Sequence, residues 1–147
     1  MSKTAQIIFP YQIDGYDSSG KKIPDIPIIY LLLKSPTGKK ISGPAIIDTG
    51  FDGSLFANDA LVLFLSDLPK ENEKIIGGFG SNEFICELFK IQAYLADNNT
   101  KIIKDLGQIL VYVPIQIDYL SEYVIIGREL LNRLNICLNG RKTTLIV

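Results

Sequence analysis

The tripeptide Asp48-Thr49-Gly50 is the part of this sequence whose residue types could carry out chemistry. It directly follows the apolar run Ala45-Ile46-Ile47, which is typical of a buried strand. Two aspartate carboxylates a few Å apart cannot both ionise, so such a pair shares one proton and can activate one water molecule. The tripeptide occurs once, so chemistry of this kind needs two copies of the chain. The alternative for the tripeptide alone is an ordinary strand that ends in a turn-forming Asp.

The sequence lacks residues that several other hydrolytic mechanisms require. The sequence has no His, which removes Ser-His and Cys-His nucleophile pairs as well as His general bases and His metal ligands. Cys86 and Cys137 stand far apart in apolar runs and form no metal-binding spacing, so both are interpreted as small core residues. A disulfide between them stays open as an alternative. We therefore expect no metal and no cofactor.

Length and charge narrow the class of protein. The 147 residues predict one domain over residues 1–147, and a chain of this size buries roughly 68–70% of its unfolded surface. The net charge is −1 and no basic arm is present, which argues against nucleic acid as a partner. The opening residues lack the features of a signal peptide, and no apolar run reaches the roughly 20 residues of a membrane span. A cytoplasmic protein with no membrane partner is expected.

Most of the chain has the pattern of β-strands. Segments rich in Ile, Val, Tyr and Phe alternate with turn signals made of Gly, Pro, Asn and Asp. Strands are predicted at residues 5–13, 26–34, 44–48, 73–76, 82–96, 102–114, 123–126 and 143–147. Short helices are predicted at residues 59–65, where Asn58 is a suitable N-terminal cap, and at residues 128–134. The prediction is a mainly β fold with one or two short helices.

Two further motifs follow the tripeptide along the chain. The segment Lys74-Ile75-Ile76-Gly77-Gly78-Phe79-Gly80-Ser81 predicts a hairpin tip that could lay backbone amides on a bound peptide. An ordinary Gly-rich turn is the alternative, and the glycine spacing fits neither common nucleotide-binding pattern. The segment Ile125-Ile126-Gly127-Arg128-Glu129-Leu130-Leu131 predicts a strand, a glycine and a helical turn. Each motif alone is weak, and the order of the three along the chain is more informative.

In this order the three motifs resemble the retropepsins, the single-domain homodimeric aspartic proteases of retroviruses, and their cellular relatives. Asp-Thr-Gly followed by Phe51 is similar to a prokaryotic group of these proteases whose motif is Asp-Thr-Gly-Phe. The resemblance covers about residues 44–147, and residues 1–43 carry no motif that aligns. It implies a closed β-barrel of the acid-protease type that acts as a homodimeric endopeptidase on peptides or unfolded proteins, without metal or cofactor.

The resemblance also assigns roles to the residues of the catalytic loop. Asp48 would be the catalytic aspartate, and one Asp48 from each chain would form the dyad. Thr49 would form a hydrogen-bonded grip between the two active-site loops, and Gly50 would contact the substrate backbone. Phe51 and Asp52 would continue this loop along the substrate-binding cleft.

The other two motifs receive supporting roles from the same resemblance. Gly77, Gly78, Phe79 and Gly80 would form the tip of a flap over the substrate. Gly127 would pack under the catalytic loop. Arg128 would form an ion pair with Asp52 and brace the site, since a planar guanidinium suits a two-pronged carboxylate contact.

Some features depart from the retropepsin pattern. Retropepsins usually have a small residue at the position of Phe51, whose ring would narrow the cleft or belong to the dimer seam. Gly53 stands where many relatives have a side chain that faces substrate, and residues 83–122 are longer than the viral counterpart. A non-catalytic dimeric module that binds peptides or proteins is therefore the alternative function, and a structural partner domain is a third.

The apolar run Thr143-Thr144-Leu145-Ile146-Val147 has two interpretations. It is either a strand of the dimer interface or a strand that completes the chain's own sheet. The sequence carries no signal for the substrate's own sequence or for a biological pathway.

Overall fold

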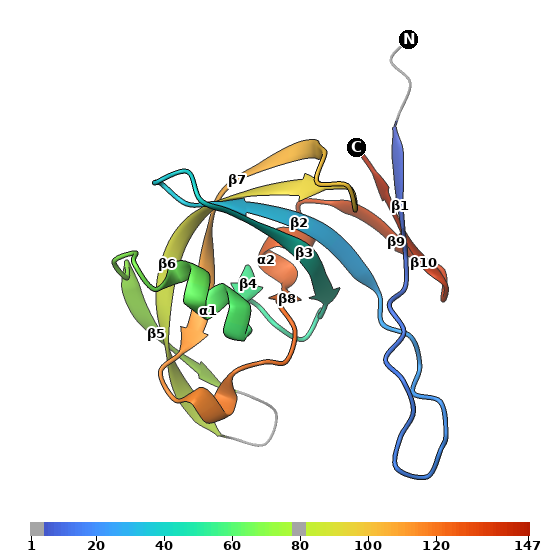
Figure 1. Cartoon of the computed structure of the whole chain (residues 1–147), viewed down its shortest axis with the longest axis horizontal. Coiled ribbons are helices and arrows are strands. Elements are labelled where there is room, and N and C mark those ends of the chain that lie inside the picture. Colours follow the sequence, from blue (N-terminus) through green and yellow to red (C-terminus); the bar gives the residue numbers. More distant parts are fainter. Residues whose placement is uncertain (1–4, 78–81) are drawn as a thin grey trace.

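The computed structural model describes residues 5–77 and 82–147, and over these ranges the chain is mostly β-strand (Figure 1). Along the chain the elements are β1 (Gln6–Pro10), β2 (Ile28–Lys34), β3 (Lys40–Ile47), β4 (Leu55–Phe56), α1 (Asp59–Leu65), β5 (Asn72–Gly77), β6 (Glu83–Ala96), β7 (Ile102–Pro114), the 3-10 turn η1 (Ile117–Tyr119), β8 (Ile125–Ile126), α2 (Arg128–Leu131), β9 (Asn135–Leu138) and β10 (Lys142–Ile146).

The larger sheet closes on itself. It has seven strands in the order β2-β3-β8-β4-β7-β6-β5, and β2 also pairs with β6. This extra pairing turns β2, β3, β8, β4, β7 and β6 into a ring, and β5 continues the sheet beyond β6. The long β6–β7 hairpin contains two register shifts. One lies beside Gly107, whose φ of 75° is in the left-handed region that glycine tolerates. Such irregularities increase the twist that a closed sheet requires.

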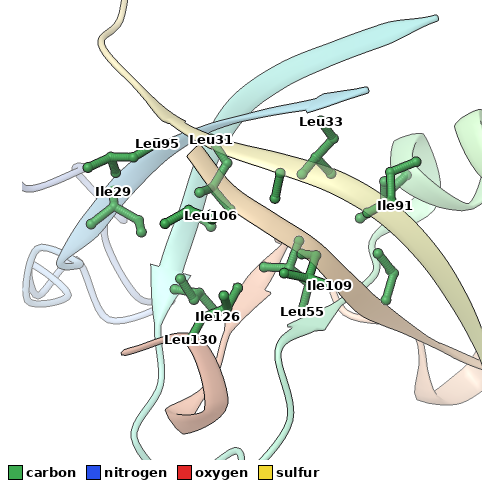
Figure 2. Close-up of a cluster of buried hydrophobic side chains, with 14 of the residues drawn as sticks. Ile29, Leu31, Leu33, Leu55, Ile91, Leu95, Leu106, Ile109, Ile126 and Leu130 are labelled. Atoms are coloured by element: carbon green, nitrogen blue, oxygen red, sulfur yellow. The ribbon is translucent and has the colours of Figure 1, made fainter. Parts of the chain in front are cut away.

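The core fills the inside of this ring. β2 is buried at almost every position, which is typical of a strand covered on both faces. Figure 2 shows side chains from β2, β4, β6, β7, β8 and α2 pointing toward one another; they are Ile29, Leu31, Leu33, Leu55, Ile91, Leu95, Leu106, Ile109, Ile126 and Leu130. Because Ile126 and Leu55 have no exposed area, the two short strands β8 and β4 are anchored in this core.

The first and last strands belong to a separate three-stranded sheet in the order β1-β10-β9. β10 pairs with β1 on one side, where Ile8 lies opposite Thr144, and with β9 on the other. Both edges of β10 are therefore occupied by strands of its own chain. Of the two interpretations of residues 143–147, the structure shows the strand that completes the chain's own sheet.

The mainly β prediction is confirmed, and the two predicted helices are present. Asn58 caps α1, because its Oδ1 accepts a hydrogen bond from the Leu61 N–H at 3.0 Å. α2 ends at Leu131, before the predicted end at residue 134, and the unpredicted strand β9 follows it. Neither helix of the described ranges has the length and apolar character needed to span a membrane.

Candidate active site

Asp48 is the first residue beyond the paired part of β3. Ile47 pairs with Ile126 of β8 in a parallel register, and the Asp48 N–H donates to the Ile126 carbonyl at 3.0 Å. The backbone of Asp48 is therefore held at the end of a core strand. Its side chain, like Thr49 and Gly50 after it, is exposed.

The turn that follows holds the Asp48 carboxylate. The Gly50 N–H donates to Asp48 Oδ1 at 2.8 Å, and the Phe51 N–H donates to the Asp48 carbonyl at 3.2 Å. A Cβ on Gly50 would lie 3.1 Å from the same Oδ1, closer than most such contacts in proteins. Gly50 therefore lets its own amide approach the carboxylate without a side chain in the way.

The start of α2 supports the loop of residues 51–54. The Gly127 N–H donates to the Ser54 carbonyl at 2.9 Å, and the Arg128 N–H donates to the Phe51 carbonyl at 2.8 Å. The first amides of a helix have no partner within the helix, and here the loop carbonyls accept from them. The loop and the helix end thereby fix each other.

The backbone at positions 127 and 53 is too crowded for any side chain larger than that of glycine. A Cβ on Gly127 would lie 2.3 Å from the Gly53 carbonyl oxygen and 2.6 Å from that of Phe51. A Cβ on Gly53 would lie 2.5 Å from Phe51 Cζ and 2.7 Å from Tyr112 Cζ. Gly127 has an extended backbone, with φ of −105°, so its need for glycine comes from crowding and not from its backbone conformation.

The Phe51 ring packs within its own chain. It makes edge-to-face contacts with Phe56 and Tyr112, with ring centroids 5.8 and 5.2 Å apart. These contacts anchor the ring, because aromatic pairs favour this geometry at such separations. Half-buried, the ring also borders the cavity beside the loop.

A cavity of about 230 Å³ opens between residues 48–54, here called the Asp48 loop, and β5. Its lining comprises Gly50, Phe51, Asp52, Lys74, Ile75, Ile76, Gly77 and Arg128. Lys74 was not predicted as a site residue; its ammonium lies 5.8 Å from the centre of the Tyr112 ring. The sequence signal for Lys74 was only its place in the strand before the glycines. Gly78, Phe79 and Gly80 of the predicted hairpin tip lie outside the described residues.

The predicted ion pair between Asp52 and Arg128 is absent. The ion pairs in the described ranges join Lys22 to Asp25, Lys39 to Asp67 and Lys70 to Glu73. Asp52 and Arg128 both border the cavity and both are exposed, and exposed ion pairs contribute only ~0–1 kcal/mol. Arg128 supports the loop through its backbone amide instead.

The cysteines differ from each other in this structure. Cys86 is fully buried, and burial raises the pKa of its thiol to about 11. Cys137 is exposed on β9, so its assignment to the core was wrong; the apolar residues around it belong to a short strand at a sheet edge. Both thiols are free. Within the described ranges no three His, Cys, Asp or Glu side chains gather as a metal site would require.

Comparison with solved structures finds a crystal structure of a retropepsin-like aspartic protease from Rickettsia conorii. The two share a TM-score of 0.50 over 99% of this chain and 96% of that chain, at 15% sequence identity. The fold is retropepsin-like. At this identity the likeness concerns the fold alone, because one fold can host different activities. No protein-family model matches the chain, and no curated protein matches it. Membership of the Asp-Thr-Gly-Phe group stays a prediction.

Proposed function

We propose that this chain is an aspartic endopeptidase that acts as a homodimer. The observation that carries the proposal is Asp48 itself, an exposed carboxylate held by a core strand and by the Gly50 amide within a retropepsin-like fold. The similar structure from Rickettsia conorii is that of an aspartic protease, which supports the same chemistry here. One chain supplies one such loop, so a second copy would complete the site.

The proposed reaction follows from a pair of Asp48 carboxylates that share one proton. The ionised member takes a proton from water, and the protonated member donates a hydrogen bond to the scissile carbonyl. Water attacks that carbonyl directly, so the step needs neither a metal nor a covalent enzyme intermediate. The exposed position of Asp48 suits this role, because a second loop could approach it without any rearrangement of the core.

The substrate would lie as an extended peptide between the Asp48 loop and β5. The cavity beside Gly50 would take a side chain of the peptide, and the hairpin of β5 and β6 would cover it. A covering hairpin excludes water and adds backbone hydrogen bonds to an extended chain. Gly77, the last residue of β5, would lie toward the end of this cover.

The test compares cleavage of a peptide library by the wild type and by Asp48→Asn at mildly acidic pH. Loss of the carboxylate should lower the cleavage rate by ~10²–10⁴-fold, the usual contribution of a general acid or base. Asp59→Asn is the matched control, since it makes the same change at an exposed carboxylate on α1. Equal activity of wild type and Asp48→Asn, or tight peptide binding without cleavage at any pH, would refute the proposal.

A further inference from the structure

A two-stranded ribbon extends away from the barrel between β1 and β2 (Figure 1). This ribbon, residues 11–27, is here called the arm. Gln12 and Ile26 exchange backbone hydrogen bonds at 2.8 Å near its base, and Tyr16 pairs with Lys22 near its end. Asp17 closes the end turn, because its Oδ1 accepts from the backbone amides of Ser19 and Lys21 at 2.9 Å. The arm is therefore an ordered hairpin.

The base of the arm is attached beside the candidate active site. The Ile47 N–H, one residue before Asp48, donates to the Pro27 carbonyl at 3.1 Å. The Tyr123 hydroxyl donates to Asp14 Oδ1 at 3.4 Å, and Tyr123 lies just before β8, whose Ile126 carbonyl holds the Asp48 amide. The arm thus leaves the body next to the strand end that delivers Asp48.

The arm exposes large apolar side chains. Ile13 is 71% exposed and Tyr16 is 70% exposed. Within the described ranges, no third strand pairs with the arm beyond its base. An isolated two-stranded hairpin is at best marginally stable in water, so a partner that covers the exposed Ile13 and Tyr16 would stabilise the arm.

We propose that the arm docks on a second copy of this chain and holds the two Asp48 loops together. The inference rests on the proposed homodimer and names a surface that forms it. A second copy fits because the site needs a second Asp48 loop, and any chain that brings one must lie next to the base of the arm.

The exposed area is of the right size for this role. A buried Tyr covers ~150–250 Å², so the 70% of Tyr16 that is exposed amounts to roughly 100–175 Å². With Ile13, and with two arms in a symmetric dimer, the arms would bury roughly 400–600 Å², about a third of a standard interface of ~1,600 Å². The remainder would come from the Asp48 loops and the surfaces around them.

The experiment measures the dimer dissociation constant by sedimentation velocity over a range of protein concentrations. The double variant Ile13→Ser/Tyr16→Ser removes the apolar contacts of the arm, and Leu63→Ser removes a side chain that is 75% exposed on α1, away from the arm (Figure 1). We expect the arm variant to raise the dissociation constant by ~10-fold or more and Leu63→Ser to leave it unchanged. Hydrogen exchange provides a second readout, since amides of the wild-type arm should become more protected as the protein concentration rises.

The outcomes separate this proposal from the proposed activity. Three results would each overturn the docking of the arm. The wild type stays monomeric, the dissociation constant of the arm variant is unchanged, or Leu63→Ser raises the dissociation constant as much as the arm variant does. An arm variant that dimerises normally but binds peptide less tightly would also overturn it, because the arm would then cover substrate. A dimer that depends on the arm but cleaves no peptide would uphold the arm and refute the peptidase. Asp48→Asn should lower cleavage by ~10²–10⁴-fold while the dimer persists.

Discussion

Gly127→Ala tests whether the start of α2 positions the loop that follows Asp48. The new Cβ would lie 2.3 Å from the Gly53 carbonyl oxygen and 2.5 Å from Phe51 Cδ2. To reach even 3.0 Å, the Gly53 carbonyl must retreat by roughly 0.7 Å, in an interior too densely packed to absorb such a shift freely. The loop of residues 51–54 would have to move, and Asp48 with it.

The expected cost combines two effects. Overpacking of this kind costs ~1–3 kcal/mol, and the hydrogen bonds from Gly127 to Ser54 and from Arg128 to Phe51 would weaken, at ~1 kcal/mol for one lost bond. We therefore expect a loss of ~2–4 kcal/mol in the free energy of unfolding, a large share of the ~5–15 kcal/mol of an ordinary domain. Peptide cleavage should fall even under conditions where the variant is folded.

Urea unfolding followed by circular dichroism measures this loss at a fixed protein concentration. Gly43→Ala is the matched control, because a Cβ on Gly43 of β3 would meet nothing within 4 Å. The same Gly127→Ala change in a Phe51→Ala background should cost nearly as much, since the closest contact is a backbone carbonyl that remains. A cost below ~0.5 kcal/mol for Gly127→Ala, or full rescue by Phe51→Ala, would refute this reasoning.

Further predictions concern a helix cap and the two thiols. Asn58→Ala should lower the free energy of unfolding by ~1 kcal/mol and Asn58→Asp should largely preserve it, because Asn58 Oδ1 accepts from the Leu61 amide; thermal unfolding of both variants measures this. A maleimide should label the native chain at the exposed Cys137, and at Cys86 only after unfolding, as read by mass spectrometry; rapid native labelling of Cys86 would contradict its burial. Burial raises the Cys86 pKa from 9.0 to about 11, so the folded state favours the neutral thiol. The stability that the neutral thiol contributes is complete below pH 9.0 and is lost as the pH rises from 9.0 toward 11. Cys86→Ala should remove this part of the alkaline loss, and identical pH profiles of the two proteins would count against it.

The elements predicted correctly are those whose capping residues and hydrophobic pattern lie in or beside the segment itself. α1 has the predicted limits, Asp59–Leu65, because a capping Asn directly precedes the segment and an apolar helical face lies within it. β7 also has its predicted limits, Ile102–Pro114. β9 was missed because the predicted helix, with Leu130, Leu131 and Leu134, ends directly before it and no turn signal separates the two segments. What makes Asn135–Leu138 a strand is its pairing with β10.

The surroundings of the site were predicted in part. The position of Asp48 at a strand end follows from the apolar run before it. The bonds from Ile47 to Pro27 and from Tyr123 to Asp14 join segments far apart in the chain, and such contacts leave no pattern in either segment. The arm was therefore not recognised as a neighbour of the site. The crowding that requires Gly53 and Gly127 likewise arises from the Phe51 ring and loop carbonyls, which only the folded chain brings together.

The central claim is that each chain supplies half of one active site, and mixed dimers test it most directly. Wild type and Asp48→Asn are unfolded together, refolded at a fixed total concentration and assayed for peptide cleavage across mixing ratios. If the site needs one Asp48 from each copy, activity falls with the square of the wild-type fraction, so an equal mixture keeps about a quarter of the wild-type rate. Activity proportional to the wild-type fraction, with about half the rate in an equal mixture, would contradict the shared site.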